Sequence, residues 1–216
     1  MKTSSPRVDE VLKHTVGPTI LDIGCSGQAG RRSAFTSDNW LHGRLLADFP
    51  NACGLEYSAD NIAALEAAGI ANVYEGDAQD FELGQTFDTI IAGEIIEHLA
   101  NVGDFLDTSR RHLAPGGRLI VTTPYPFNIF FVLYAWLRFP HTCSNDEHVM
   151  WFCPSTINTV AKGHGFRIVE NTLVADYRRD LASRIGRIIG YFGRALRRVL
   201  PIRLVGTNMV VVMVPE

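Results

Sequence analysis

A glycine-rich turn directly after a short apolar run constrains the fold of this chain more than any other feature. The run 19–23 contains Asp22, and Gly24, Gly27 and Gly30 follow it. Glycine lets the backbone approach a ligand that a Cβ atom would block. In open α/β sheets, ligands bind at the carboxyl ends of the strands, where the strand order reverses. The pattern therefore predicts the first strand of a nucleotide-binding sheet.

The glycine spacing differs from two common nucleotide motifs. The dinucleotide fingerprint Gly-x-Gly-x-x-Gly is missing, because Ser26 stands where its second glycine would be. No Gly-Lys-Ser/Thr sequence is present, so the turn is not a P-loop. A nicotinamide-dependent oxidoreductase is therefore the less favoured of the alternatives.

Two further apolar runs also end in acidic residues. The run 52–57 closes on Glu56, and the run 72–78 reaches Asp77. A carboxylate at the end of the second strand can accept hydrogen bonds from both ribose hydroxyls, and one after the third strand can accept from an adenine amino group. Either acid alone also serves as an ordinary cap of a helix or turn. Together, after the glycine turn, they favour an adenosine site.

Short strands and helices alternate along most of the chain, which is typical of a doubly wound α/β sheet with helices on both faces. Strands are predicted at 19–23, 52–57, 72–75, 87–92, 117–123, 166–174 and 207–214. Helices are predicted over Arg7–His14, Asp38–Asp48, Ala59–Ala67 and Val102–Leu113, and from a cap at Ser155 to Lys162. The run 115–117, Pro-Gly-Gly, should end the helix that starts at Val102.

The ordered motifs of this chain resemble those of the class I S-adenosylmethionine-dependent methyltransferases. They are Leu21-Asp22-Ile23-Gly24-Cys25, Gly54-Leu55-Glu56-Tyr57-Ser58, Gly76-Asp77-Ala78, Phe87-Asp88-Thr89-Ile90-Ile91, Glu94-Ile95-Ile96-Glu97-His98-Leu99 and Leu113-Ala114-Pro115-Gly116-Gly117-Arg118-Leu119. The resemblance covers Thr15 to Phe166 and a last strand. It implies a Rossmann-like, seven-stranded sheet of order 3-2-1-4-5-7-6 whose last strand is antiparallel.

The same resemblance implies S-adenosylmethionine as the cofactor and S-adenosylhomocysteine as the product. The residues that it assigns to cofactor binding are Asp22, Gly24, Cys25, Glu56, Tyr57, Asp77, Ala78 and Glu94. The chain departs from the family pattern at Ser26 and Gln28, which are usually glycine. An insertion, Arg31–Trp40, also lengthens the stretch between the turn and Glu56.

The sequence Glu94-Ile95-Ile96-Glu97-His98 follows the predicted fourth strand, and the resemblance implies that it faces the methyl group of the cofactor. Histidine can remove a proton from an acceptor near neutral pH, so His98 is a candidate catalytic base. Some relatives in ubiquinone synthesis and small-RNA methylation hold a divalent metal with a similar Glu-x-x-Glu-His set. We expect Glu94 and Glu97 or His98 on one side of a helical turn, but do not favour a metal.

The segment 141–153 lies where the resemblance implies an acceptor pocket, and His148 is the expected partner of His98 across the methyl group. Trp151 and Phe152 are expected to cover that pocket, because acceptor pockets are mostly apolar. A zinc site is the less favoured alternative, because its spacing matches no compact zinc module. Its ligands would be His141, Cys143, His148 and Cys153.

We expect one domain, 1–216, with inserts at about 124–153 and 177–204. The first would be an acceptor lid and contains an apolar run, 127–139, too short to span a bilayer. The second would be a basic amphipathic helix. Its apolar face would carry Leu181, Ile185, Ile188, Phe192, Leu196 and Val199, and its basic face Arg184, Arg187, Arg194, Arg197 and Arg198. Such a helix either packs on the domain with solvated arginines or rests on an anionic membrane.

Composition bounds the class of protein and its partners. The chain has 216 residues, of which 46% are apolar, enough for a sizeable core. Its net charge of −3 does not favour nucleic acid as a partner. The four cysteines form no CxxC pair and indicate no disulfide framework, so we expect a cytoplasmic protein, with peripheral contact to the inner face of the membrane as an alternative.

Two functions therefore remain open beside the oxidoreductase. The favoured one is methyl transfer to a small-molecule, glycan or lipid-linked acceptor, with oxygen as the favoured acceptor atom. The other is a non-catalytic relative that acts as an adaptor through the basic helix. Fold alone does not choose the acceptor.

Overall fold

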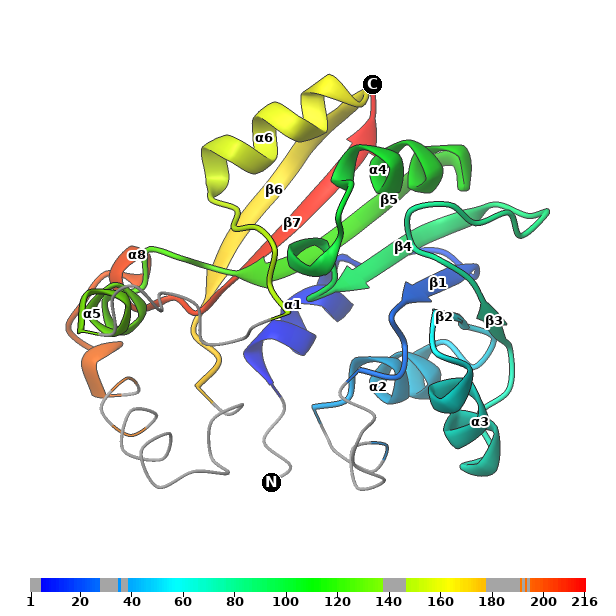
Figure 1. Ribbon diagram of the computed structural model, residues 1–216, viewed down its shortest axis with the longest axis horizontal. Coiled ribbons are helices and arrows are strands. Elements are labelled where there is room, and N and C mark those ends of the chain that lie inside the picture. The colour runs from blue at the N-terminus through cyan, green and yellow to red at the C-terminus, as the bar shows by residue number, and fades with distance from the viewer. Residues whose placement is uncertain are drawn as a thin grey trace.

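The computed structural model describes residues 5–27, 35, 39–137, 147–177, 191, 193 and 195–216. A mixed sheet of seven strands in the order β3-β2-β1-β4-β5-β7-β6 runs through this part of the chain (Figure 1). The strands are β1 (Ile20–Ile23), β2 (Cys53–Glu56), β3 (Val73–Glu75), β4 (Phe87–Gly93), β5 (Leu113–Pro124), β6 (Phe166–Val174) and β7 (Asn208–Pro215). β7 is antiparallel to both β5 and β6, and the other pairs are parallel. The predicted strand order and antiparallel last strand are confirmed.

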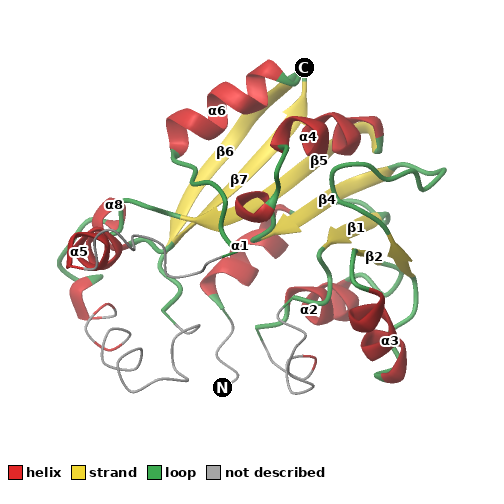
Figure 2. Ribbon diagram, in the orientation of Figure 1, coloured by secondary structure: helices red, strands yellow, loops and turns green. Residues whose placement is uncertain are grey.

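Both faces of the sheet are apolar, as a parallel sheet covered by helices requires. Successive strand residues point to opposite faces. In β4, Ile90 packs in the larger cluster with α4 (Val102–Arg111) and α6 (Pro154–Gly163), whereas Ile91 packs in a second cluster with α1 (Pro6–His14) and α2 (Leu41–Asp48). Figure 2 shows the yellow sheet between these helices. α3 (Ala59–Ala67) packs through Leu65 in a third, smaller cluster.

Local capping explains where several helices begin. Ser5 accepts a hydrogen bond from the Val8 amide, and Pro6 occupies the first turn of α1, where its missing N–H costs nothing. Asn101 caps α4 by accepting from the amides of Gly103 and Asp104.

Several predicted boundaries were wrong. α4 ends at Arg111 instead of Leu113, because Leu113 already pairs with Phe87 as the first residue of β5. The sequence 115–117 therefore forms an irregularity inside β5, where the register shifts, instead of ending a helix. α6 is capped by Cys153 with Pro154 in its first turn, so Ser155 lies inside the helix. α2 begins at Leu41, after Trp40, and the predicted start at Asp38 lies outside the described residues.

The two predicted inserts are described in part. The apolar run of the first forms α5 (Ile129–Leu137), and 138–146 lie outside the described residues. Of the predicted basic helix, 178–190, 192 and 194 lie outside them as well. Its described end is not one helix: a turn follows Leu196, and Pro201 precedes a separate short helix, α8 (Ile202–Val205). No helix in the described part of the chain is both long and apolar enough to cross a membrane.

Candidate active site

The glycine turn follows β1 and is hydrogen-bonded to the carboxyl end of β2. Gly24 has φ of 73°, and its amide donates to the Leu55 carbonyl over 2.8 Å. A Cβ atom on Gly24 would lie 2.2 Å from Cδ1 of Ile95, so a side chain at this position would require the Ile95 side chain to shift. The positive φ of Gly24 is a backbone conformation that glycine adopts without strain. Gln28 and Gly30 lie outside the described residues.

Glu56 is held at the end of β2 by several donors. Its Oε1 accepts from the amides of Tyr57 and Ser58, each over 3.1 Å. Its Oε2 accepts from the Ser26 hydroxyl over 2.5 Å, and Asn61 donates to that hydroxyl over 3.2 Å. Ser26, the departure from the usual glycine, therefore helps to orient the predicted ribose-binding carboxylate. The sequence pattern did not predict this contact.

Asp77 lies beside Glu56, at the end of the neighbouring strand. The Gly76 amide donates to the Glu56 carbonyl over 3.0 Å, which joins the two strand ends. The Asp77 carboxylate accepts from the Gln79 amide over 2.8 Å. The next residue, Ala78, packs against the main core, and Tyr57 is 76% exposed. The structure therefore brings the predicted adenosine-binding residues to one edge of the sheet.

Asp22 is buried and paired, an arrangement that its motif did not predict. Its Oδ2 lies 3.1 Å from Nδ1 of His42, which comes from α2 and is fully buried. Cys25, in the turn after β1, is buried, and Nε1 of Trp40 donates to its carbonyl over 2.7 Å. These two contacts anchor α2 and the preceding Trp40 against β1 and the turn.

Arg7 is the main site residue that sequence reasoning missed. It comes from α1, is 8% exposed, and its Nη1 donates to the Thr122 hydroxyl over 3.2 Å. Its Nε has no hydrogen-bond partner among the described residues. Burial lowers the pKa of its guanidinium, while Asp176, Asp22 and Glu97 favour the charged form. A buried cation at the sheet edge provides a binding group for an anionic ligand. The only sequence signal was an arginine on the apolar face of the first helix.

Glu94 follows β4 with φ of 63°, a conformation that non-glycine residues rarely adopt. Its Oε1 accepts from Asn208 over 2.7 Å and from Thr122 over 3.4 Å. Ile96–His98 form a short 3-10 helix just beyond it. Glu94 therefore does not share one side of a helical turn with Glu97 and His98, and that expectation was wrong.

Glu97, His98 and His148 do meet. One ligand atom from each lies within 4.8 Å of those from the other two. The rings of His98 and His148 stand edge to face with centroids 4.7 Å apart. Nδ1 of His98 lies 3.1 Å from the carbonyl of Glu147 and donates to it, which leaves Nε2 as the acceptor of the neutral ring.

The local environment sets the charge of this cluster. Burial raises the pKa of Glu97 to about 7, although the Thr123 hydroxyl donates to its Oε2 over 3.0 Å. Its Oε1 is buried and has no partner among the described residues. Burial, and then the neighbouring His98, lower the pKa of His148. His148 is therefore uncharged at neutral pH and able to accept a proton.

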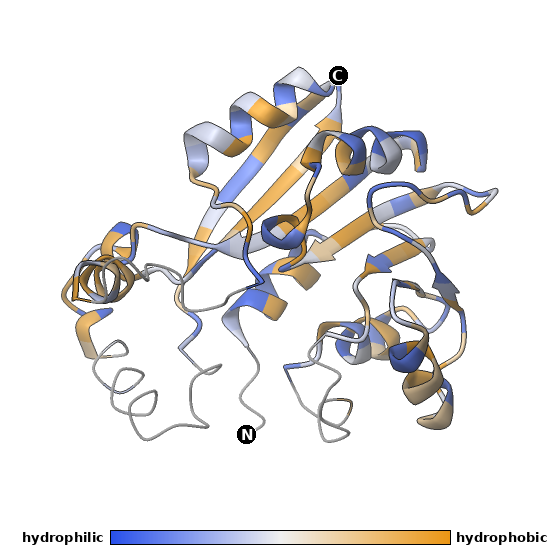
Figure 3. Cartoon of the chain, in the orientation of Figure 1, coloured by the Kyte–Doolittle hydropathy of each residue, from blue (hydrophilic) through white to orange (hydrophobic). Residues whose placement is uncertain are grey.

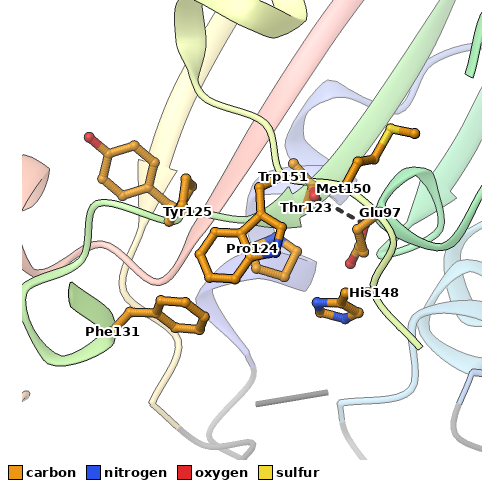
Figure 4. Close-up of a pocket in the computed structure, with 9 residues that line it drawn as sticks. Glu97, Thr123, Pro124, Tyr125, Phe131, His148, Met150 and Trp151 are labelled. Carbon is orange, nitrogen blue, oxygen red and sulfur yellow. Dashed lines mark hydrogen bonds between the residues drawn. The ribbon is translucent and has the colours of Figure 1, made fainter. Parts of the chain in front are cut away.

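A small hollow opens beside the cluster (Figure 4). Its walls carry aromatic rings and prolines around the polar edge formed by Glu97 and His148. The lining residues are Glu97, Thr123, Pro124, Tyr125, Pro126, Phe131, His148, Met150 and Trp151. Trp151 lines it and packs on Phe131 of α5, with ring centroids 4.4 Å apart, whereas Phe152 is buried in the main core.

The two predicted metal sites have different outcomes in the structure. The residues Glu97, His98 and His148 offer one carboxylate and two imidazole ligands, a set that suits a divalent transition metal. The unpartnered Oε1 of Glu97 fits such an ion. For the zinc alternative, His141 and Cys143 lie outside the described residues, and Cys153 caps α6 without joining the cluster found among the described residues.

The chain is similar to known proteins in both sequence and structure. A family model described as a methyltransferase domain matches residues 5–171. A ubiquinone biosynthesis O-methyltransferase of Nitrobacter winogradskyi is 37% identical over 117 residues, 52% of this chain and 41% of the relative. One from Caulobacter sp. is 49% identical over 118 residues, 50% of this chain and 41% of the relative. The match thus spans less than half the length of these relatives.

Solved structures share the fold at low sequence identity. A SAM-dependent methyltransferase from Archaeoglobus fulgidus superposes with a TM-score of 0.63 at 18% identity, over 96% of this chain and 90% of that one. A glycopeptide N-methyltransferase in complex with S-adenosylhomocysteine superposes with a TM-score of 0.64 at 14% identity, over 99% of this chain and 88% of that one. With the matched family model, the motif order and the confirmed strand order, the chain belongs to the class I S-adenosylmethionine-dependent methyltransferases.

Proposed function

We propose that this protein transfers the methyl group of S-adenosylmethionine to an oxygen atom of a small-molecule acceptor. The observation that carries the proposal is the pair His98 and His148, which stands at the polar edge of an apolar hollow beyond β4 and β5. Family membership supports the cofactor, and the ring pair supports an acceptor whose proton must be removed.

The cofactor would lie across the carboxyl ends of the strands. Glu56 would accept from the ribose hydroxyls and Asp77 from the adenine amino group, because the two carboxylates stand at adjacent strand ends. The buried guanidinium of Arg7 would bind the carboxylate of the methionine portion, since it is the cation near Asp22 and Thr122 at this edge. This orientation would direct the methyl group toward Glu97 and the histidine pair.

The sulfonium already activates the methyl group, so the protein mainly has to align the acceptor with it. A hydroxyl acceptor must lose a proton as the new bond to carbon forms. His148 can accept that proton, because its pKa is lowered and its ring is neutral. His98 is held by the Glu147 carbonyl with Nε2 as an acceptor, which provides a second base.

The same three side chains fit a divalent ion. Glu97, His98 and His148 would hold it through one carboxylate oxygen and two ring nitrogens. A bound ion would stabilise negative charge on an acceptor oxygen. With or without an ion, Glu97 would help to orient that acceptor, because its own position is fixed. The Thr123 hydroxyl donates to its carboxylate, and the Val149 amide donates to its backbone carbonyl.

The hollow favours a flat, apolar acceptor with a hydroxyl group. Tyr125, Phe131 and Trp151 supply ring surfaces, and Glu97 and His148 supply the polar edge. The names of the related ubiquinone biosynthesis O-methyltransferases support a phenolic quinone precursor as the first acceptor to test. Glycan and lipid-linked hydroxyls are the next ones.

The test separates binding from turnover. Calorimetric titration with S-adenosylhomocysteine, with NAD as the control and with Mg²⁺, Zn²⁺ or EDTA present, should show micromolar binding of the first ligand alone. Turnover of labelled S-adenosylmethionine on a phenol panel should follow. Binding without transfer to any phenol, glycan or lipid hydroxyl would support the adaptor alternative, and absence of binding would overturn the proposal.

A further inference from the structure

α5 presents an apolar stripe to solvent. The helix reads Ile-Phe-Phe-Val-Leu-Tyr-Ala-Trp-Leu, and none of its residues is buried. The most exposed positions recur at i, i+3, i+4, i+7 and i+8, which is one face of a helix. They are Ile129 at 42%, Val132 at 51%, Leu133 at 53%, Trp136 at 76% and Leu137 at 66% exposed. A helix face of this period normally covers a core, but here it is exposed to solvent. Figure 3 colours much of α5 as hydrophobic.

A second apolar surface lies against the same helix. Phe130 of α5 packs in a small cluster with Leu196, Leu200 and Val205, which come from the segment 195–205. That segment exposes Val199 at 75%, Ile202 at 41% and Leu204 at 38%. α5 and α8 lie side by side in Figures 1 and 2, at the end of the sheet where β5 leads into α5. We name the exposed residues of α5 and of 195–205 the α5–α8 face.

The charge on this face is of one sign. Arg197, Arg198 and Arg203 are exposed on 195–205. The sequence has no acidic residue from 124 to 137 or from 181 to 215. None of the three arginines forms a salt bridge with another residue in the described part of the chain. The described residues of the face therefore combine large apolar side chains with cations, and the two stretches that form it contribute no carboxylate.

We propose that the α5–α8 face binds the surface of an anionic lipid bilayer. Interfacial helices bind a bilayer in two ways at once: their apolar side chains enter the acyl boundary, and their basic side chains contact anionic headgroups. Trp136 suits this boundary, because its ring is apolar and its N–H is polar. A protein partner would need a matching acidic groove, whereas a bilayer supplies both the apolar layer and the negative charge.

The face is continuous with the candidate acceptor site. Phe131, one position before the exposed Val132, lines the hollow and packs on Trp151. One helix therefore presents its outer stripe to the bilayer and its inner side to the site. A lipid-linked or membrane-dissolved acceptor would enter the hollow beside α5 without crossing bulk water, and this part of the inference rests on the proposed function.

Co-sedimentation of the full chain with vesicles tests the proposal. Vesicles of neutral phosphatidylcholine are compared with vesicles that contain phosphatidylglycerol as a minor component. We expect binding to the anionic vesicles that weakens as salt rises. The triple variant Arg197→Gln/Arg198→Gln/Arg203→Gln should lose roughly a hundredfold in affinity for them. The double variant Leu133→Ser/Trp136→Ser should lose binding to the anionic vesicles as well, because the apolar side chains would no longer enter the acyl boundary.

Matched controls exclude a general effect of charge or apolar area. Lys162→Gln/Arg167→Gln removes two cations from α6 and β6, and Val169→Ser removes an exposed apolar side chain from β6. Both controls should bind vesicles like the unchanged protein. Thermal unfolding and affinity for S-adenosylhomocysteine should stay unchanged in every variant, so vesicle binding is measured independently of the proposed methyl transfer.

Two results would overturn the proposal. One is an anionic vesicle affinity that is undetectable, or that the arginine and apolar variants leave unchanged. The other is a concentration-dependent dimer, seen by light scattering, that Leu133→Ser/Trp136→Ser abolishes without any vesicle binding by the unchanged protein. That second result would assign the α5–α8 face to contact between two copies of the chain.

Discussion

His98 and His148 are fifty residues apart in the chain, yet their imidazole rings stand edge to face with centroids 4.7 Å apart. His98 belongs to the 3-10 helix after β4, and His148 to the segment before α6. The Val149 amide donates to the Glu97 carbonyl over 2.9 Å and ties these two segments together. The pair thus depends on backbone contact between segments as well as on the rings.

His148→Gln should reduce kcat for a hydroxyl acceptor by about a hundredfold or more, because the variant lacks the proton acceptor. Affinity for S-adenosylhomocysteine should not change, since His148 is placed on the acceptor side. Steady-state kinetics and calorimetry measure the two quantities. His164→Gln is the matched control, because His164 pairs with Asp107 on the surface. An unchanged kcat in His148→Gln would remove it from the catalytic role.

Glu56→Gln should weaken cofactor binding by about tenfold to a hundredfold, because a carboxylate that accepts from ribose hydroxyls contributes about 1.5–3 kcal/mol. The amides of Tyr57 and Ser58 would still hold one side-chain oxygen, so the fold should persist. Calorimetric titration with S-adenosylhomocysteine gives the affinity. Glu170→Gln on β6 should bind normally, and equal affinity in both variants would refute the ribose assignment.

Arg7→Met should weaken binding of S-adenosylhomocysteine but leave binding of methylthioadenosine, which lacks the amino-acid carboxylate, unchanged. The reason is that, of all the groups of the ligand, only that carboxylate would contact the buried guanidinium. We expect a loss of about tenfold to a hundredfold for the first ligand, the range for a charge-assisted hydrogen bond. Arg44→Met serves as the control, because it removes a surface guanidinium whose Nη2 lies 3.7 Å from Oδ1 of Asp9. Equal losses for both ligands would point to a structural role.

Cys153 should react with iodoacetamide at a rate that rises as pH passes about 7, because hydrogen bonds from Ser155 and Thr156 lower the pKa of its thiol to about 7. Only the thiolate attacks, so the rate should be low below that pH and constant well above it. Cys53 is the internal control, because burial raises the pKa of its thiol. Peptide mass spectrometry after timed labelling resolves the two sites. A Cys153 profile with its midpoint above that of Cys53 would contradict the prediction.

Much of the candidate cofactor site was predictable from local sequence. Gly24, Glu56 and Asp77 each lie within a few residues of a strand end, and the carboxyl ends of parallel strands necessarily share one edge of the sheet. The strand order was what the resemblance carried by the ordered motifs implied. The boundary of α4 was not predictable in the same way, because Leu113 leaves the helix only when it pairs with Phe87.

The sequence by itself determined the period of the strands, the glycine turn and the order of the acidic strand ends, since these features depend on neighbours along the chain. Only the tertiary structure decided that Arg7 reaches the sheet edge, that Glu94 turns to Asn208, and that Glu97, His98 and His148 meet. Tertiary structure also left the apolar stripe of α5 uncovered. Periodicity shows which residues share a helix face, but which surface that face meets depends on the packing of distant segments.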